Sequence, residues 1–342
     1  MEIRRGIIAS LMTMNPKQDL ILARLGGSSM PVSGDLLADE LGLSRAGIWK
    51  HIQSLRKQGI EIESHPGRGY RLKSDVLSPA MLRRHLGDTV IGSECMVLEE
   101  IDSTNREAMR LGESGAKEGL VIIANRQTTG RGRLGRSWHT EAHDSLAMSI
   151  LLRPNISPEK VPQLSLLTAV ALHKALSHFA TDIGIKWPND MLHNGGKIAG
   201  ILTEMRAEPG QVHAVVIGIG VNIRKPSDGW PKEITQQVTD LSTAAGKDMN
   251  RLDVALAIIR AMEISYREYL ADGFAPVREK WWQAHAASGQ QVRAHGGTGY
   301  IEGVAEALDE DGALLLNVDG QLQRFIAGDI ELMGKNTMGS ER

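Results

Sequence analysis

The chain has 342 residues, and its 39 lysines and arginines nearly balance its 41 aspartates and glutamates, which leaves a formal net charge of −2. A chain of this length exceeds a usual single domain, so we expect two or three domains with a substantial core. The charge balance excludes a globally basic protein, and any nucleic-acid contact must come from a local patch. The single Cys95 precludes an intramolecular disulfide and fits a cytoplasmic protein. No apolar run approaches the length of a membrane span.

The first part of the chain has the pattern of a winged helix-turn-helix domain. Residues 1–17 hold a short apolar patch that we interpret as an extension, and the domain itself is expected over residues 18–75. Ser33 and Ser44 precede helical patterns as N-cap residues. The expected elements are helices over 19–25, 33–41 and 44–59 and strands over 60–64 and 70–72.

The predicted recognition helix, which follows Ser44, lies in a locally basic stretch. Between Ser44 and Lys73, seven lysines and arginines face two acidic residues. Docking of such a helix in the major groove needs both the helix geometry and the positive charge, so we expect DNA binding. A winged helix that contacts protein instead is the alternative. The expected DNA contacts are Ser44, Arg45, Lys50, His51 and the wing residue Arg68.

A segment rich in glycine and arginine, G-R-G-R-L-G-R-S-W over residues 130–138, follows a strand-like apolar run. Glycines let backbone N–H groups approach a ligand closely, and arginines offer forked donors suited to phosphate or carboxylate. The segment is typical of an anion-binding loop, with a solvated surface loop as the alternative. Two further segments favour a binding site: D-S-T-N at 102–105 and K-W-P-N-D at 186–190.

Mixed strand and helix patterns predict an α+β sheet domain over residues 78–285. Ser78 and Pro79 mark its entry as an N-cap followed by proline at the first helical position. The segment G-I-G-V-N at 218–222 lacks the third glycine and the helix of a dinucleotide fingerprint, so we interpret it as a strand end that lines the site. We reject a metal site, because no recognisable ligand spacing joins the histidines His139, His143, His173 and His178.

The last part of the chain, residues 288–335, changes to short alternating strands. Asp-Gly pairs at 311–312 and 319–320 are hairpin signals. We therefore expect a small SH3-like β-barrel as the third domain.

Five motifs follow one another along the chain in this order: D-S-T-N, Q-x-x-G-R-G-R-x-G-R-x-W, K-W-P-N-D, K-x-A-G-I-L-x-E and G-x-G-x-N. Together they resemble the motifs of the biotin–protein ligases, in particular the bifunctional members that also repress the biotin operon. The resemblance covers most of the chain and implies a catalytic domain of the biotin/lipoate ligase type. It implies that the protein uses ATP with Mg²⁺ to form biotinyl-5'-adenylate, and transfers biotin to a lysine of a biotin carboxyl carrier protein. It also implies that an adenylate-bound homodimer binds the biotin operator.

The matched motifs imply roles for individual residues. Arg133 and Lys186 are the expected catalytic cations, with Arg133 holding the adenylate and Lys186 near the biotin carboxylate and the α-phosphate. Arg136 and Asn222 are expected to contact the nucleotide, whereas the ligands of Mg²⁺ stay unassigned. Leu134 stands where several bifunctional members carry another arginine. The expected biotin pocket consists of Ser103, Thr104, Asn105, Gln127, Arg131, Gly132, Arg133 and Lys186.

Two alternatives of other classes stay open. One is a biotin-sensing transcription factor without transfer activity, and the other is a ligase whose winged helix does not bind DNA. Lipoate ligases and octanoyltransferases share the broad catalytic fold, but G-R-G-R-x-G-R together with K-W-P-N-D favours biotin.

Overall fold

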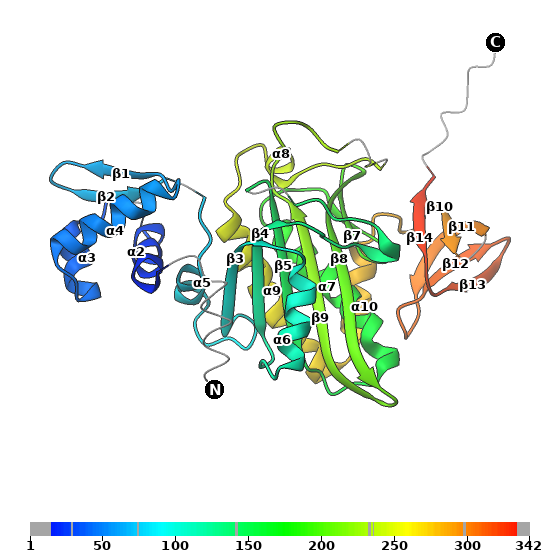
Figure 1. Ribbon diagram of the computed structural model, residues 1–342. Coiled ribbons are helices and arrows are strands. Elements are labelled where there is room, and N and C mark those ends of the chain that lie inside the picture. The colour runs from blue at the N-terminus through cyan, green and yellow to red at the C-terminus, as the bar shows by residue number, and fades with distance from the viewer. Residues whose placement is uncertain are drawn as a thin grey trace, which may run out of the picture.

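The computed structural model describes residues 15–28, 30–73, 75–140, 143–231, 234, 236–296 and 299–333. Figure 1 shows three units in chain order: a helical unit with a two-stranded sheet, a central sheet covered by helices, and a small unit of strands. Residues 1–14 of the expected extension lie outside the described residues. Helix α2 begins at Pro16 with Asn15 as its cap, so the helical unit starts inside the range assigned to the extension.

The first unit has the element order of a winged helix-turn-helix. The hydroxyl groups of Ser33 and Ser44 cap α3 and α4 as expected, and Gly42 ends α3 with a φ of 60°, where glycine avoids strain. The inner face of α4 is the apolar stripe Ile48, Ile52 and Leu55, all buried. The elements are α2 (Pro16–Gly26), α3 (Gly34–Leu41), α4 (Arg45–Lys57), β1 (Ile62–His65) and β2 (Gly69–Leu72).

A seven-stranded sheet in the order β3-β4-β5-β9-β8-β7-β6 forms the second unit. β3 and β4 pair in parallel, and the other neighbouring pairs are antiparallel, which confirms the mixed sheet. Its strands are β3 (Glu94–Ile101), β4 (Leu120–Gln127), β5 (Ser145–Leu152), β6 (Ile183–Lys186), β7 (Asp190–His193), β8 (Gly196–Glu208) and β9 (Gln211–Asn222).

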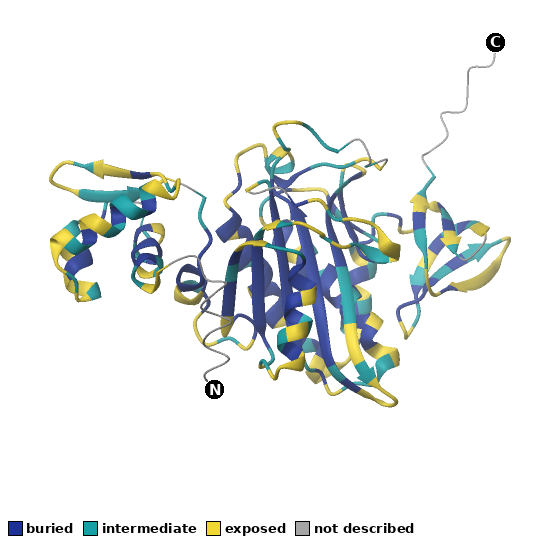
Figure 2. Cartoon of the chain, viewed as in Figure 1, coloured by how far each residue is buried: buried dark blue, intermediate teal, exposed yellow. Residues whose placement is uncertain are grey.

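Successive residues of a strand point to opposite faces of the sheet, and on the inner strands both sets are apolar. Helices therefore cover both faces of this sheet. On β4, Ile122 packs with α6 in one cluster, whereas Val121 and Ile123 belong to the large core shared with α7 and α9. Figure 2 shows β4, β5 and β9 buried along most of their length. The helices are α5 (Pro79–Leu86), α6 (Thr104–Glu113), α7 (Val161–Leu176), α8 (Leu241–Ala245), α9 (Arg251–Asp272) and α10 (Ala275–Gln283), with 3-10 turns at Arg133–Gly135 and Pro158–Lys160.

Strand β7 was not predicted from the sequence. After β6 the chain turns at Pro188 and Asn189 and runs back beside it, so that Lys186 lies opposite Asp190 in the hairpin. β8 then pairs with β7 and with β9, closer to the middle of the sheet. Because of this hairpin, Lys186 on β6 and Lys197 on β8 lie at different distances from the pocket described below.

The third unit is a five-stranded antiparallel sheet in the order β13-β12-β11-β10-β14, as expected for an SH3-like domain. β13 and β14 are its edges, so the pairing itself does not close a barrel. The unit contacts the central one, where the ring centroids of Trp187 and Phe325 lie 5.4 Å apart. Its strands are β10 (Gln291–Gly296), β11 (Gly299–Leu308), β12 (Leu314–Val318), β13 (Gln321–Phe325) and β14 (Asp329–Leu332). Within the described ranges, no helix is long and apolar enough to cross a membrane.

Candidate functional site

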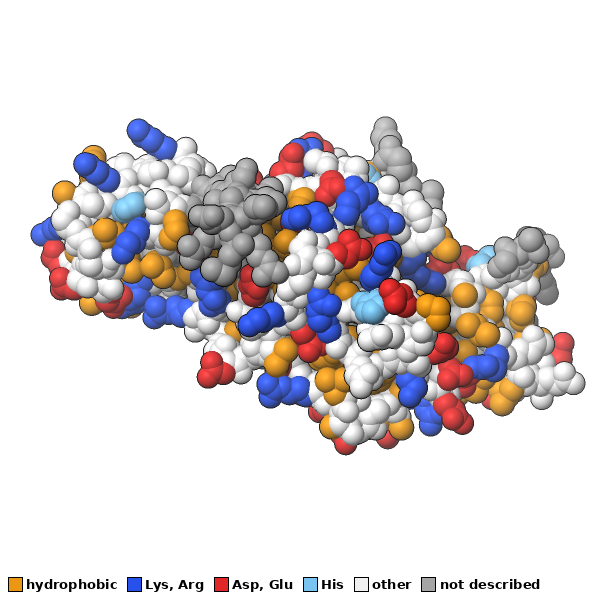
Figure 3. All heavy atoms as spheres, turned by 60° about the horizontal axis from the view of Figure 1, so that its bottom comes forward, with side chains coloured by type: hydrophobic (Ala, Val, Ile, Leu, Met, Phe, Trp, Pro, Cys, Tyr) orange, Lys and Arg blue, Asp and Glu red, His pale blue; other side chains and the backbone are white. Residues whose placement is uncertain are grey.

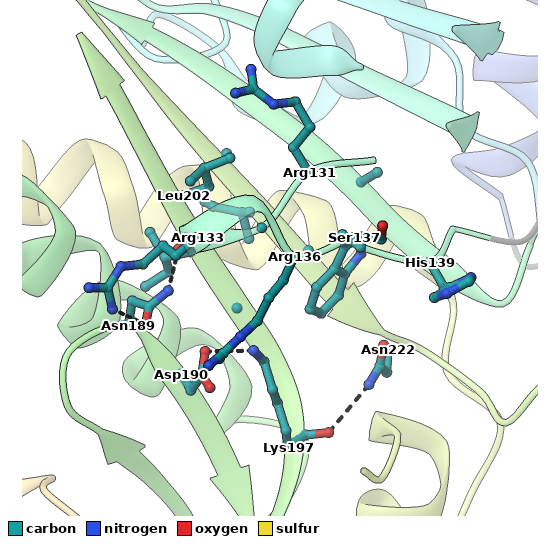
Figure 4. Close-up of a pocket in the computed structure, with 18 of the residues that line it drawn as sticks. Arg131, Arg133, Arg136, Ser137, His139, Asn189, Asp190, Lys197, Leu202 and Asn222 are labelled. Carbon is teal, nitrogen blue, oxygen red and sulfur yellow. Dashed lines mark hydrogen bonds and ion pairs between the residues drawn. The ribbon is translucent and has the colours of Figure 1, made fainter. Parts of the chain in front are cut away.

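A pocket lies over the α6 face of the central sheet, between the start of α6 and the glycine- and arginine-rich loop of residues 130–138 (Figure 4). β8 and β9 form its floor, and Asp329 of the third unit reaches its rim. Of the residues expected at the ligand site, the pocket brings together Ser103, Thr104, Asn105, Gln127, Arg131, Gly132, Arg133, Arg136 and Asn222. Lys186 is not among its lining residues.

The D-S-T-N motif forms one wall of the pocket at the N-terminus of α6. The backbone N–H of Thr104 donates to Oε1 of Gln127 at 2.8 Å, and Oγ of Ser149 lies 2.6 Å from Oδ1 of Asn105. Nδ2 of Asn105 donates to Oε2 of Glu204 at 2.8 Å. Because Thr104, Asn105 and Ser149 are buried, these bonds satisfy their polar groups and hold each side chain in one position. The wall is therefore a preformed polar surface.

Two glycines of β9 form the floor of the pocket. A Cβ atom at Gly218 would lie 2.2 Å from Oδ1 of Asn105, and one at Gly220 would lie 2.3 Å from Cε2 of Trp138. Both distances are too short for any side chain, so the polar wall and the Trp138 ring rest directly on the backbone of the sheet. The glycine spacing of G-x-G-x-N thus serves close packing beneath the pocket, and the segment is a strand end as expected.

The glycine- and arginine-rich loop folds back on itself as a small hairpin. The N–H of Trp138 donates to the carbonyl oxygen of Gly130 at 2.9 Å, and Leu134 at the tip is exposed with a φ of 55°. In Figure 4, Arg131 points away from the other labelled cations. Its Nη1 pairs with Oε1 of Glu204 at 2.9 Å, so Arg131 joins the loop to the carboxylate that also holds the α6 wall.

The other two arginines of the loop reach toward the third unit. Nη1 of Arg133 donates to Oδ1 of Asn189 at 3.0 Å and lies 3.7 Å from Oδ1 of Asp329. Nη2 of Arg136 lies 2.7 Å from Oδ2 of Asp329. One carboxylate therefore stands between two guanidinium groups, in the arrangement that an anionic ligand would use.

A lysine of the pocket is Lys197, not Lys186. Nζ of Lys197 lies 2.7 Å from Oδ1 of Asp190 and 5.6 Å from the centroid of the Trp138 ring. Lys186 belongs to β6, the edge strand, and β7 lies between it and β8, the strand that carries Lys197. The signal was present in the sequence, since Lys197 begins the K-x-A-G-I-L-x-E motif.

The pocket is positive overall. Arg131, Arg133, Arg136 and Lys197 line it, against the carboxylates of Asp190 and Asp329. Asn222 fixes the geometry at the end of β9, where its Nδ2 donates to the carbonyl oxygens of Lys197 at 3.3 Å and Thr239 at 3.0 Å. No group of three or more histidine, cysteine, aspartate or glutamate residues that could hold a metal ion occurs among the described residues.

The residues expected to contact DNA lie on the N-terminal unit. The hydroxyl of Ser44 accepts from the N–H of Gly47 at 3.1 Å, so it is engaged in the cap, and Arg45 lies 3.4 Å from Asp35. Trp49 was not expected here, yet its side chain on α4 is 55% exposed. Three further residues were expected to contact DNA. Lys50 and Arg68 are exposed, and His51 is half-buried.

Comparisons with known proteins agree with this arrangement. Residues 97–222 match the biotin/lipoate A/B protein ligase family, residues 17–71 an HTH domain, and residues 287–333 the biotin protein ligase C-terminal domain. The biotin protein ligase of Aquifex aeolicus, solved in complex with biotin and ATP, superposes with a TM-score of 0.60 at 28% identity, over 70% of this chain and 99% of that one.

Two relatives span nearly the whole chain. The bifunctional ligase/repressor BirA of Bacillus spizizenii is 40% identical over 92% of this chain and 98% of its own, and the BirA of Escherichia coli K12 is 32% identical over 88% and 92%. Because this identity runs through all three units in the same order, the chain belongs to the bifunctional ligase/repressors of the biotin/lipoate A/B protein ligase family.

Proposed function

We propose that this protein activates biotin with ATP and transfers it to a lysine of a biotin carboxyl carrier protein. The observation that carries the proposal is one pocket in which a preformed polar wall faces Arg133, Arg136 and Lys197. The polar wall suits the neutral ring system of biotin, and the cations suit its carboxylate and the phosphates of ATP.

In the first step, a carboxylate oxygen of biotin attacks the α-phosphorus of ATP, and the bond to the β-phosphate bridge breaks to release pyrophosphate. Negative charge gathers on oxygens of the α-phosphate as this happens. Fixed cations around these oxygens stabilise the transition state more than the separated substrates. We assign this role to Lys197 and Arg133, with Arg136 on the departing phosphates, and Lys197 replaces Lys186 of the original expectation.

In the second step, the neutral ε-amine of the acceptor lysine attacks the acyl carbon of biotinyl-5'-adenylate. An amide forms, the bond to the phosphate oxygen breaks, and AMP leaves with its negative charge while the amine loses a proton. The same cations stabilise the AMP phosphate as a leaving group. No nucleophilic side chain is needed, which fits a pocket built from arginines, a lysine and amides.

Mg²⁺ enters this proposal together with ATP. Mg²⁺ in nucleotide sites is held largely by phosphate oxygens and water, with one or two carboxylates. Asp190 and Asp329 are the carboxylates at the pocket, and each pairs with a cation before ligand binds. The residues therefore fit a metal that arrives with the nucleotide rather than a resident one.

We further propose that the winged helix-turn-helix makes the protein a biotin-responsive repressor. A basic recognition helix joined to a biotin site gives one molecule both a sensor and an operator-binding surface. In the same proposal, bound adenylate orders the loop at residues 130–138 and favours a homodimer on DNA. A cytoplasmic location also belongs to it and fits the buried, unpaired Cys95.

The test of the ligase is transfer of labelled biotin to a purified carrier domain in the presence of Mg²⁺ and ATP. Lys197→Ala is expected to lower the rate by about 10²- to 10³-fold, as loss of one charge-stabilising group does. Lys186→Ala is the matched control and is expected to stay within about twofold, since it removes the same side chain outside the pocket. A loss confined to Lys186→Ala would return the catalytic role to Lys186, and equal losses would overturn its use as a control. Biotin binding without transfer by the wild type would favour the sensor alternative.

A further inference from the structure

Trp49 is a large apolar side chain that the fold leaves in solvent. It is the one exposed tryptophan of the six, all of which lie in described residues, with 55% of its surface accessible. The core beneath α4 is filled by Ile48, Ile52 and Leu55, which are fully buried. No aromatic pair or cation–π contact within the described part of the chain involves Trp49. Its position therefore contributes little to the fold of the unit.

The position of Trp49 on α4 places it in the middle of the outward face. Arg45 stands four residues before it and Gln53 four residues after it, so the three side chains follow one another along the same face. Lys50 is its exposed neighbour in sequence. An indole thus lies beside two cations, Arg45 and Lys50, on the face that the proposed function turns toward the major groove.

The charges around this face favour a polyanionic partner. Lys50, Lys57 and Arg68 are exposed and enter no ion pair among the described residues, whereas Asp35 pairs with Arg45 at 3.4 Å. On the wing, Glu63 is already paired with Arg71 at 2.9 Å. Figure 3 shows several basic side chains on the part of this unit in view, with its acidic ones gathered at one edge.

Cations on such a face bind phosphates and carry little sequence information. Sequence is read at base edges, where thymine is marked by its C5-methyl group, an apolar feature that side chains recognise by contact. A tryptophan one turn into the recognition helix has the apolar surface for such a contact and a single N–H donor beside it. A groove about 12 Å wide admits both the helix and the indole.

We propose that Trp49 reads the operator directly by packing its indole against thymine C5-methyl groups, while Arg45 and Lys50 contact the flanking phosphates. This inference rests on the proposed operator binding. Removal of the indole should weaken binding to the specific site and leave binding to unrelated DNA unchanged. The salt dependence of binding should also stay unchanged, because that slope counts phosphate contacts.

The experiment uses the full chain with biotin, Mg²⁺ and ATP. Duplexes are first selected from a random library with the wild type, and thymines of the selected site are then replaced singly by deoxyuridine, which removes the methyl group alone. For the wild type, one or two replacements are expected to weaken binding about five- to tenfold, the lower part of the range for a changed base pair. Trp49→Ala is expected to bind the unmodified site more weakly by a similar factor and to lose its sensitivity to the same replacements.

Leu36→Ala is the matched control, because Leu36 is 41% exposed on α3 and lies outside the recognition helix. It is expected to bind and discriminate as the wild type does, and both variants should keep full ligase activity. If Trp49→Ala still loses affinity on deoxyuridine replacement as the wild type does, the inference is wrong. A Trp49→Ala protein that binds the site normally but no longer self-associates would assign the indole to a protein contact and also overturn it. Failure of the wild type to enrich any duplex would refute operator binding itself, and the inference with it.

Discussion

The carboxylate of Asp329 lies 2.7 Å from the guanidinium of Arg136 and thereby connects the third unit to the loop over the pocket. The same carboxylate is 3.7 Å from Arg133, and the carbonyl oxygen of Gly328 accepts from Arg133 at 3.4 Å. An acid of the third unit thus pairs with the two arginines assigned to the adenylate. Phosphates bound by these arginines, as we propose, would compete with Asp329, which would link nucleotide binding to the position of the third unit.

The first prediction is that Asp329→Asn lowers the KM for ATP. The amide keeps the shape of the side chain but removes the charge that competes with phosphate for Arg133 and Arg136. Since Arg136 is more than half exposed, the pair is screened by solvent, and we expect a decrease of no more than about fivefold. Steady-state transfer kinetics at varied ATP measure it, with the KM for biotin as the internal control. A rise in the KM for ATP would mean that Asp329 orients the arginines rather than competing for them.

The second prediction concerns the glycine floor. Gly220→Ala would place a methyl group 2.3 Å from the ring of Trp138, which must then move into the pocket. We expect biotin affinity to fall by at least about fivefold, because overpacking of this kind costs about 1–3 kcal/mol. Isothermal titration with biotin measures the change. Gly299→Ala is the control, since its Cβ would meet no atom within 4 Å. Unchanged biotin affinity in Gly220→Ala would show that Trp138 is not held over the biotin site.

Sequence reasoning found the residues whose signals are local. Ser103 to Asn105 were recognised because a D-S-T-N run at a strand-to-helix junction places them together, and the loop at 130–138 because glycine and arginine alternate there. Lys186 was predicted from its place in K-W-P-N-D, and that it lies outside the lining of the pocket could not be predicted, because without the β6–β7 hairpin the order of strands near the pocket cannot be deduced. Asp329 carries no local signal at all, since its partners are far away in the chain and meet it through tertiary packing.

Trp49 is a different case, because its exposure could have been inferred. It follows the buried Ile48 directly and is therefore turned about 100° away from the inner stripe of α4. The charged residues of this face were predicted to contact DNA, whereas Trp49 on the same face was not. The winged helix, the mixed sheet and the antiparallel third unit were all predicted, because their caps, periodicities and Asp-Gly turns are short-range features.

The third prediction is that Arg251→Met destabilises the protein strongly. Arg251 is 1% exposed, its Nε lies 3.3 Å from Oδ2 of Asp75, and its Nη1 donates to Oδ1 of Asn125 at 2.8 Å. It thereby fixes the segment between the first two units to the start of α9. Arg251→Met leaves Asp75 paired with Arg224 at 3.3 Å but removes a buried cation from that carboxylate and a donor from Oδ1 of Asn125, so we expect the free energy of unfolding to fall by about 3 kcal/mol.

Urea denaturation at neutral pH measures this change, and the double variant with Asp75→Asn tests its cause. If the loss comes from the broken pair between Arg251 and Asp75, the double variant is less destabilised than the sum of the single ones. Additive losses would place the cost of Arg251→Met in packing instead.

The fourth prediction is a pH dependence of stability through His285. This imidazole is 5% exposed, its Nδ1 donates to the carbonyl oxygen of Ile185 at 2.8 Å, and its ring lies 4.6 Å from that of Trp281. Burial disfavours the charged form and lowers the pKa of His285 from 6.5 to about 4. Between these two values the unfolded chain binds more protons at this position than the folded one, so stability rises with pH.

The contribution of His285 is fully present above pH 6.5 and is lost as the pH falls toward about 4. A shift of this size corresponds to about 3 kcal/mol. His285→Asn keeps a donor near the carbonyl of Ile185 but cannot titrate, so its free energy of unfolding should change less between pH 7 and pH 5 than that of the wild type. Urea denaturation at both pH values gives the comparison. Parallel pH profiles for the two proteins would show that His285 takes up its proton without cost in the folded state and would contradict the prediction.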